Sequence, residues 1–374
     1  SIAPGAELFF ATETPGTAGL LQAIEDLSQA GVDIIVDDVT RPAAYPFQDD
    51  EVAVAVKRAS DAGILYFTSS GNTGNALNGR ASSYEADYRS GTGPVLREGY
   101  MDLHLFDDNS WGNTLIANAS IVCLFWSDPI GASANDYDLY VYDANLNLVN
   151  YSADFQDGNG FPIECVFGVE YTQILVVMRD EGAERRAIHL AVSGGDYQPG
   201  MLFTTAGGIR GHQGSAGAFA VAATSAAGQT TPFTPESRVE AFSTDGFRRI
   251  LFEADGTPIT PGDFSLSGGE LRRKPDITAA DGVATNVPGF ESFFGTSAAA
   301  PNAAGIAALM LQANRDLTPA QVREIFAETA IDIEAPGIDP NSGNGIVMAT
   351  AVLQYLLQTK SISTMGPLAG IALA

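Results

Sequence analysis

The chain has 374 residues, with 45 acidic against 19 basic side chains and a formal net charge of −26. At 45% hydrophobic and 17% charged residues it is a globular chain, and its acidic balance argues against a protein that tracks nucleic-acid phosphates or an anionic membrane surface. No apolar run approaches the roughly 20 residues of a transmembrane helix. With three histidines in the chain, a multi-His metal centre is nearly excluded, and a catalytic histidine could only be His104, His189 or His212.

Strands and helices alternate over the first 70 residues. Apolar runs predict a buried strand and two further strands, and apolar residues at helical spacing predict two helices between them. In chain order these elements are Glu7–Thr12 (strand), Thr17–Ala30 (helix), Asp33–Val39 (strand), Asp49–Ala62 (helix) and Ile64–Ser69 (strand). Short links in such an alternation predict an α/β fold, a parallel sheet sandwiched by helices, with function at the carboxyl ends of the strands.

The pattern changes between about residues 93 and 200, where short alternating runs are separated by Asp, Asn and Gly turns. This pattern predicts an antiparallel β-sandwich inserted into the α/β domain. We therefore expect an α/β domain in two parts, 1–92 and 202–374, interrupted by a β domain at 93–201. The α/β pattern returns with Ala218–Ala223, and Ser297–Asn314 reads as an Ala-rich, buried helix.

Two groups in the predicted β domain have alternative interpretations. Cys123 and Cys165 either form one inter-sheet disulfide in an oxidising compartment or remain two buried thiols. Asp136, Asp138 and Asp143 either bind a structural Ca²⁺ through carboxylate oxygens or form a solvated acidic turn.

The most specific segment is Gly295–Pro301, with the sequence GTSAAAP. Ser297 falls at the start of the buried helix, where free N–H groups and the helix dipole favour an alkoxide or an oxyanion. A plain helix cap would look the same. Asn72 follows the third strand in the sequence SSGNTG, where its amide either points at a developing oxyanion or forms an Asn-Gly type of turn.

Together these segments resemble the subtilisin-like serine peptidases and their relatives the sedolisins. Ile2–Leu8 (IAPGAEL), Lys274–Ala279 (KPDITA) and Asn341–Ala349 (NSGNGIVMA) are similar to further motifs of this family, in the same order. The resemblance covers about residues 1–90 and 205–357. The predicted β domain lies outside it, and around Asp136–Val141 it faintly resembles calcium-binding β-sandwiches of secreted bacterial peptidases.

The resemblance implies a chemistry that needs no cofactor. Ser297 would be the nucleophile, and Asn72 with the Ser297 backbone N–H would form the oxyanion hole. An extended peptide or protein substrate would pair with the strand around Asp38. The other residues implied to line the substrate site are Val39, Thr40, Ser69, Ser70, Gly71, Gly295 and Thr296.

The chain also departs from the family. Subtilisins carry a catalytic His on a helix before the APGA segment and an Asp on an earlier strand, whereas sedolisins carry a Glu and an Asp on that helix. We expect these elements in an upstream segment, cut away or supplied as a separate chain. Asp38 is either an active-site carboxylate sharing a proton in sedolisin style or simply an acidic residue at a strand end. His212 either shapes the pocket or binds an ion, or it is a supporting residue.

Two functions are therefore in view. The first is a secreted or cell-surface serine endopeptidase acting through an acyl-enzyme at Ser297. The second is a catalytically incomplete relative that binds peptides or surfaces, with a structural or adhesive role for the β insert as a further alternative. Only three lysines in an acidic chain suit an extracellular setting, although an ordinary acidic soluble protein would also have this composition.

Overall fold

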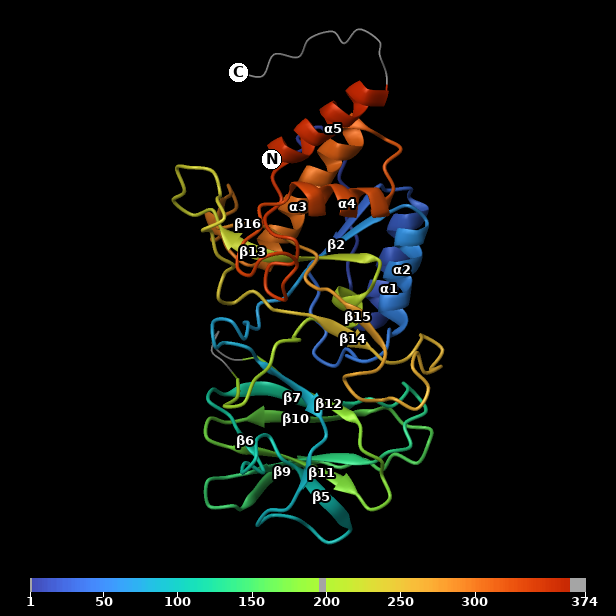
Figure 1. The fold of residues 1–374 in the computed structure, drawn as a ribbon, viewed down its shortest axis with the longest axis vertical. Helices are drawn as coiled ribbons and strands as arrows, with labels where there is room; N and C mark the ends of the chain where they lie inside the picture. Colours follow the sequence, from blue (N-terminus) through green and yellow to red (C-terminus); the bar gives the residue numbers. More distant parts are fainter. Residues whose placement is uncertain (1, 195–199, 364–374) are drawn as a thin grey trace.

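The computed structural model describes residues 2–194 and 200–363. The described chain forms two parts stacked along the long axis of the molecule (Figure 1). One part contains a parallel sheet with helices, and the other contains two antiparallel sheets. Within these residues, the structure has no helix of the length and apolarity that crossing a membrane requires.

The parallel sheet has four strands in the order β1-β2-β13-β16. They are β1 (Ile34–Asp37), β2 (Leu65–Ser69), β13 (Ala218–Ser225) and β16 (Ile277–Asp281). Neighbouring strands pair in parallel, with Val36 opposite Phe67 and Phe67 opposite Phe219. The second and third strands predicted from the first 70 residues are confirmed as β1 and β2.

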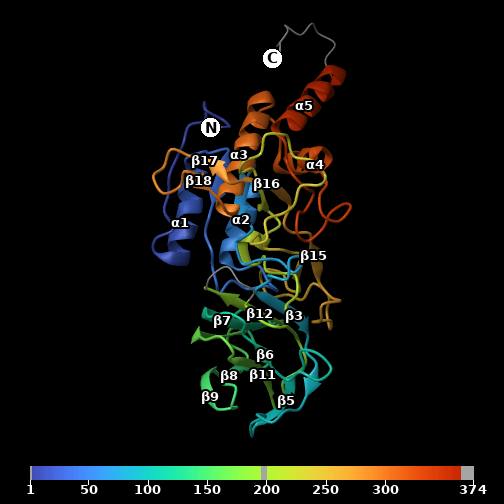
Figure 2. The ribbon, with the colours of Figure 1, turned by 90° about the vertical axis from the view of Figure 1, so that its left-hand side faces the viewer.

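Helices cover both faces of this sheet, as the sequence predicts. On one face lie α1 (Gly16–Gln29) and α2 (Glu51–Asp61), whose Leu20, Ile24 and Val56 pack against Ile35 and Tyr66. On the other face lie α3 (Thr296–Ala313), α4 (Pro319–Thr329) and α5 (Ala349–Ser363). The small alanines of α3 allow it to lie close against the sheet, and Figure 2 shows α3 beside β16.

The strand predicted at Glu7–Thr12 is wrong. These residues form no strand, and the side chains of Leu8 and Phe10 are 91% and 93% exposed. An apolar run becomes a buried strand only where a neighbour offers its hydrogen-bonding edge, and no described strand pairs with this segment. The parallel sheet therefore begins at β1, which is an edge strand.

The second part contains two antiparallel sheets. One sheet has the order β10-β7-β12-β3, and the other has the order β4-β5-β11-β8-β9, with β6 paired to β11. Their strands are β3 (Ser83–Asp87), β4 (Ser90–Gly91), β5 (Tyr100–His104), β6 (Asn113–Thr114), β7 (Ala119–Trp126), β8 (Tyr137–Tyr142), β9 (Leu148–Ser152), β10 (Ile163–Val169), β11 (Ile174–Asp180) and β12 (Ala187–Ser193). Side chains of both sheets, such as Leu124, Leu139 and Val177, share one buried core.

The antiparallel part begins earlier than residue 93. β3 lies within the range expected for the α/β domain, yet it pairs with β12, with Ser83 opposite Ala191. Only two residues separate β3 from β4, and β4 pairs with β5 in the other antiparallel sheet. The sequence Ser83–Asp87 is too polar and too short to be separated from a loop by its pattern alone.

Cys123 and Cys165 form a disulfide. They lie directly opposite one another on β7 and β10, with their Cα atoms 4.2 Å apart. The disulfide therefore joins neighbouring strands of one sheet, and the expectation of a bridge between two sheets is wrong.

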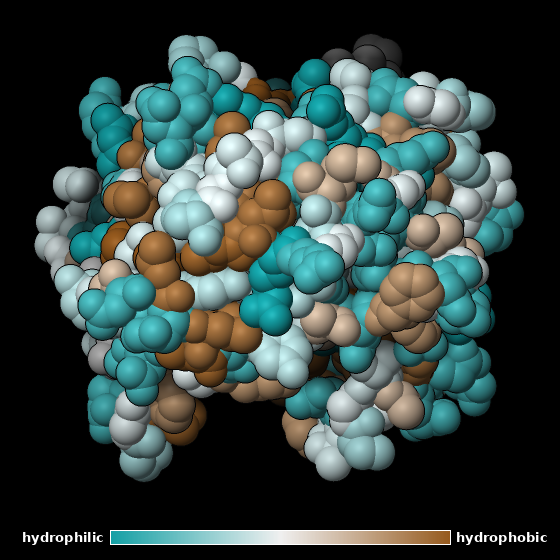
Figure 3. All heavy atoms as spheres, turned by 90° about the horizontal axis from the view of Figure 1, so that it is seen from below, coloured by the Kyte–Doolittle hydropathy of each residue, from teal (hydrophilic) through white to brown (hydrophobic). Residues whose placement is uncertain are grey.

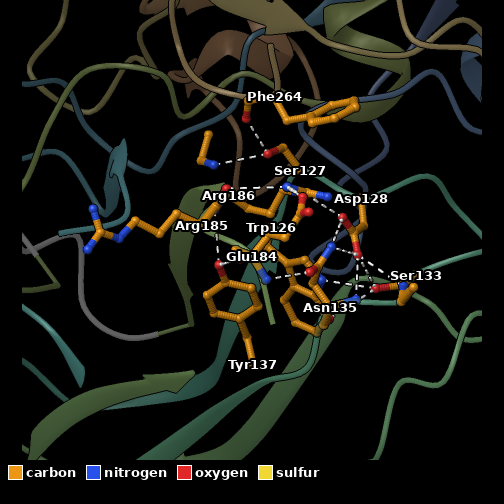
Figure 4. Close-up of polar contacts among 12 residues, drawn as sticks. Trp126, Ser127, Asp128, Ser133, Asn135, Tyr137, Glu184, Arg185, Arg186 and Phe264 are labelled. Atoms are coloured by element: carbon orange, nitrogen blue, oxygen red, sulfur yellow. Dashed lines mark hydrogen bonds and ion pairs between the residues drawn. The ribbon is translucent and has the colours of Figure 1, made fainter. Parts of the chain in front are cut away.

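A buried polar network fixes the antiparallel part to the rest of the chain (Figure 4). Asp128 accepts hydrogen bonds from Asn135 and from Arg186 Nε, the latter at 2.7 Å. Ser127 donates its hydroxyl to the carbonyl of Phe264, and the Arg186 guanidinium lies 4.5 Å from the centre of the Phe264 ring. The segment around Phe264 follows the parallel-sheet strand β13, so this network joins the two parts.

Smaller elements complete the described chain. A 3₁₀ turn, η1 (Gly211–Gly214), precedes β13, and two short hairpins are formed by β14 (Arg248–Ile250) with β15 (Glu270–Arg272) and by β17 (Val283–Ala284) with β18 (Ser292–Phe293). Figure 3 views the end of the molecule formed by the antiparallel sheets, where apolar patches lie among polar residues.

Candidate active site

Ser297 lies in the first turn of α3. The preceding Gly295 is the N-cap residue and has a φ of +110°, a backbone conformation that strongly favours glycine. The amides of Ala298 and Ala299 donate to the Gly295 carbonyl, so these two N–H groups are satisfied. Among the described residues, neither the amide nor the hydroxyl of Ser297 has a hydrogen-bond partner, and its side chain is partly exposed. Both groups are therefore available to a substrate.

Asn72 is held against the same loop. Its Oδ1 accepts hydrogen bonds from the Thr296 amide at 3.0 Å and from Thr296 Oγ1 at 2.9 Å. The amide of Gly71 in turn donates to Thr296 Oγ1 at 3.2 Å. The segments Ser69–Gly74 and Gly295–Pro301, which the sequence analysis singled out separately, are therefore bonded to one another.

Three polar groups surround one small space in front of Gly295. A Cβ atom at this residue would lie 3.4 Å from Asn72 Nδ2 and 3.7 Å from both the amide N and the Oγ of Ser297. Because glycine has no Cβ, the space is free. Two N–H donors and a nucleophilic hydroxyl around one point are the groups needed to attack a carbonyl and to stabilise the resulting oxyanion.

A buried carboxylate supports this loop. Asp281 is the last residue of β16, the strand that begins within the KPDITA motif. Asp281 Oδ2 accepts a hydrogen bond from the Gly295 amide at 2.8 Å. Burial raises the pKa of Asp281 to about 6, and the charge of Glu240 adds to the rise. An Asp at the end of a buried strand was the signal that could have identified this support.

Two neighbouring aspartates at the end of β1, Asp37 and Asp38, differ in burial. Asp38, the predicted active-site carboxylate, is exposed, whereas its neighbour Asp37 is buried. Asp37 Oδ1 accepts from Thr68 Oγ1 at 2.8 Å and lies 3.2 Å from His212 Nε2. Burial alone would raise the pKa of Asp37, but the charge of His212 and hydrogen bonds from His212 and Thr68 outweigh it, and the pKa lies below its usual value.

The partners of the histidines limit the choice of a base. His212 is buried beside Asp37, His189 is bonded to Glu85, and His104 to Tyr84. His212 is thus a supporting residue under the β1 end and is not an exposed ion ligand. These are the three histidines of the chain, and over residues 2–194 and 200–363 none of these side-chain contacts joins a histidine to Ser297.

Besides Gly71, Gly295 and Thr296, which lie at the Ser297 loop, the residues predicted to line the substrate site fall into two groups. Val39 and Thr40 line a cavity of about 260 Å³ between the β1 end and the start of α1, together with Glu13 and Arg41. Ser69 and Ser70 are buried instead, and their backbone is tied down, with the Ser69 carbonyl accepting from Gln213 Nε2 at 2.7 Å. They can contribute to a substrate site only through the backbone.

The three aspartates predicted to bind Ca²⁺ do not form one site, because only Asp136 and Asp138 lie close enough for their charges to interact. Asp143 is partly exposed, and its carboxylate accepts hydrogen bonds from Asn145 and Asn147 in the turn after β8. Asp136 and Asp138 are buried, and each keeps one Oδ1 without a partner among the described residues. Ca²⁺ takes six to eight oxygen ligands, and over residues 2–194 and 200–363 no three His, Cys, Asp or Glu side chains are arranged to hold a metal. The set does not fit a calcium ion.

Comparison with known proteins identifies the family. The subtilase family profile matches residues 1–345. The chain belongs to the subtilase family. Over 77 residues, 21% of this chain, it is 38% identical to fervidolysin of Fervidobacterium pennivorans, and this stretch is 11% of the length of that protein.

Among solved structures, this subtilase resembles the CspB protease of Clostridium perfringens. The TM-score is 0.57 at 13% identity, over 95% of this chain and 72% of the other. At this identity the likeness shows the fold alone, and it extends over the antiparallel sheets as well as the parallel one. The family confirms the resemblance inferred from the sequence motifs, and it supports a serine peptidase.

Proposed function

We propose that this subtilase is a serine endopeptidase that forms an acyl-enzyme at Ser297, with its general base and acid supplied by a segment outside residues 1–374. The single observation that carries the proposal is the space in front of Gly295, where Asn72 Nδ2, the Ser297 amide and Ser297 Oγ converge. A protein that only binds peptides has no need of this combination.

The steps follow from these groups. Ser297 Oγ attacks the carbonyl carbon of the scissile peptide bond while its proton passes to the external base. The oxyanion that forms accepts hydrogen bonds from Asn72 Nδ2 and from the Ser297 amide, and the C–N bond then breaks as the proton moves to the leaving amine. Water hydrolyses the resulting ester and releases the second product. This chemistry requires no cofactor.

Each of the three histidines contacts another side chain, namely Asp37, Glu85 or Tyr84, and this supports a base supplied from outside these residues. The exposed apolar side chains Leu8 and Phe10, and the edge position of β1, provide surfaces that such a segment would cover. We propose the protein's own N-terminal segment, in the same chain or as a separate one, as this partner. Asp38, exposed at the end of β1, would share a proton with an acid of that segment.

Residues 83–193 are proposed to form an inserted β-sandwich domain. Two antiparallel sheets with a common buried core support this, since each sheet covers the apolar face of the other. An extracellular or cell-surface location is proposed as well. The disulfide supports it, because such bonds persist mainly in oxidising compartments.

Covalent labelling tests the nucleophile. We expect a fluorophosphonate probe to label the folded, full-length protein, and expect Ser297→Ala to abolish the labelling. Ser292→Ala, at an exposed serine outside the loop, is the matched control and should be labelled normally. A folded full-length protein that is not labelled would favour the alternative function, a catalytically incomplete relative that binds peptides, which the absence of a histidine base at Ser297 would explain.

A further inference from the structure

A second cavity adjoins the proposed oxyanion hole. It has a volume of about 220 Å³ and is lined by Asn72, Thr73 and Gly74 on one side and by Asn118, Val192 and Ser193 of the antiparallel part on the other. Small-molecule sites commonly measure about 300–1,000 Å³, so this cavity suits a single side chain. Asn72 lines both this cavity and the space in front of Gly295.

The charge of the cavity is unusual for this chain. Of the described residues that line it, only Arg80 is ionisable, and its side chain is exposed. Within residues 2–194 and 200–363, the Arg80 guanidinium has neither an ion pair nor a hydrogen bond. In a chain with 45 acidic and 19 basic residues, an arginine that meets no carboxylate presents its positive charge to whatever enters the cavity.

The cavity beside Val39 provides a contrast. It also contains an arginine, but Arg41 is bonded to Asp50 at 2.6 Å, and Glu13 lies on the same wall. Its positive charge is therefore already balanced by carboxylates. Of the two cavities, the one beside Asn72 is the one suited to a negatively charged side chain.

The walls on the α/β side are held rigidly. The Gly74 amide donates to the Phe242 carbonyl at 2.8 Å, and Thr73 Oγ1 lies 2.9 Å from Thr244 Oγ1. Asn75 Nδ2 lies within hydrogen-bond distance of the carbonyls of Ala241 and Ser243. Segments that are far apart in the sequence are therefore fixed at the cavity before any ligand arrives, which reduces the ordering cost of binding.

The wall on the antiparallel side is anchored as well. The Val192 amide donates to the Ser82 carbonyl at 2.8 Å, and Asn118 Oδ1 accepts from the Tyr171 amide at 2.8 Å. Gly194 approaches Ser120 so closely that a Cβ would lie 2.2 Å from Ser120 Oγ. The inserted sheets are thus part of the cavity and do not merely lie near it.

We propose that this cavity is a substrate subsite that selects an acidic side chain next to the scissile bond, with Arg80 as its specificity-determining residue and residues 117–118 and 192–194 as its second wall. The proposal rests on the proposed peptidase function. A carboxylate of the substrate would accept charge-assisted hydrogen bonds from the Arg80 guanidinium, and aspartate or glutamate would be preferred over asparagine or glutamine.

Cleavage-site profiling of the full-length protein with a peptide library tests the proposal. We expect aspartate or glutamate to be enriched at one position within two residues of the cleaved bond. Arg80→Gln should lower kcat/KM for such substrates by about tenfold and leave neutral ones unchanged, and Arg80→Glu should shift the preference to basic side chains. Arg185→Gln is the matched control, since Arg185 is exposed and points away from the polar network (Figure 4).

A steric variant tests the second wall. Ala117→Phe places a large ring in the cavity from the antiparallel side, and it should raise KM for acidic substrates more than for small neutral ones. Ser297-dependent cleavage without an acidic preference, or a preference that Arg80→Gln leaves intact, would overturn the subsite while leaving the peptidase function in place.

A peptide-binding measurement distinguishes a failure of the proposed subsite from a failure of the proposed peptidase function. In the Ser297→Ala variant of the full-length protein, a fluorescent peptide containing aspartate should bind about tenfold more tightly than its asparagine counterpart, and Arg80→Gln should remove this difference. If wild-type protein cleaves nothing, the peptidase function fails, and the binding difference still decides the subsite. Equal affinities for the two peptides would overturn it.

Discussion

The side-chain oxygen of Asn72 faces the backbone amide of Thr296 at 3.0 Å. A backbone N–H can only donate, so the atom that faces it must be Oδ1, and Nδ2 is consequently directed to the opposite side. There it lies next to the amide and hydroxyl of Ser297. The threonine that precedes Ser297, the proposed nucleophile, thereby sets the orientation of the Asn72 amide, the proposed oxyanion donor.

This arrangement predicts that Asn72→Asp is a selective catalytic variant. The aspartate keeps an acceptor for Thr296 but loses the Nδ2 donor, so kcat should fall by about 10²–10³ with little change in KM. Steady-state kinetics of the full-length protein measure this. Asn72→Ala is the comparison, because it also removes the bonds to Thr296 and should in addition lower the melting temperature. Unchanged kcat in Asn72→Asp would show that Asn72 is not an oxyanion donor.

Asp138 predicts a pH dependence of stability. Burial raises its pKa to about 7, and the charges of Asp136 and Glu164 contribute to the rise. A carboxyl group with a raised pKa binds its proton more tightly in the folded protein, so the stability it contributes is complete below about pH 4 and is lost as pH rises towards 7. Asp138→Asn should keep the bond to Tyr100 and raise the melting temperature at pH 8 but not at pH 4.

Calcium provides the control for this prediction. Because the carboxylates around Asp138 do not fit a calcium site, millimolar Ca²⁺ should leave the melting temperature at pH 8 unchanged. Stabilisation by Ca²⁺ that Asp138→Asn abolishes would show that these oxygens bind the ion after all.

For Asp37 we expect the opposite pH dependence of stability, with the stabilisation lost at low pH instead of high pH. Its pKa is held below the usual value by His212 and Thr68 in spite of burial, so its contribution to stability is present above about pH 4 and is lost as pH falls below that range. Asp37→Asn should cost about 1.5–3 kcal/mol of unfolding free energy at pH 7, as expected for hydrogen bonds to a charged group. Denaturant unfolding at pH 7 and pH 3 should show that the difference becomes smaller at the lower pH.

The neighbouring Asp38→Asn is the matched variant. Asp38 is exposed, so stability should be unchanged, whereas the proposed role at the active site predicts an altered pH profile of peptidase activity. Full activity with the wild-type profile in Asp38→Asn would exclude that role.

The disulfide predicts a local loss of stability. Replacing both Cys123 and Cys165 by alanine should lower the unfolding free energy by about 2–4 kcal/mol, because the bond closes a loop with a sequence separation of 42. Thermal unfolding of the double variant and of wild type under oxidising conditions measures this difference. A reductant, which opens the disulfide of the wild type, should bring the two melting temperatures together. If wild type and double variant melt together under oxidising conditions, the two cysteines are not bonded in solution.

The sequence was sufficient where local patterns and global packing agree. Apolar spacing in Thr17–Ala30 and the run Ile64–Ser69 correctly predicted a helix and a buried strand of the parallel sheet. The run Glu7–Thr12 is equally apolar, but whether a run is buried depends on a partner strand, which no local pattern reveals. For Ser83–Asp87 the error was the opposite one, since a strand was missed. The segment is short and polar, and it is a strand only because it pairs with β12, which lies far away in the sequence.

The site could be predicted in part for the same reason. Ser297 and Asn72 lie in motifs, which can be recognised from the residues next to them in the sequence. Which of Asp37 and Asp38 faces inward depends on the exact register of β1, and the function of Asp281 depends on a loop 14 residues further along the chain. Arg80 stands in no motif, and only the approach of the antiparallel sheets gives it a cavity to occupy.

The pairing of β3 with β12 has a consequence for the history of the protein. Ser83 lies opposite Ala191, so the polypeptide departs from the parallel-sheet unit and comes back to it at nearly the same point. A module with adjacent ends can be gained or lost by a host gene in a single event, because a short turn could replace it without moving a strand of the host. The same junction carries the cavity beside Asn72, so such an event would alter the proposed subsite and leave Ser297, the proposed nucleophile, in place.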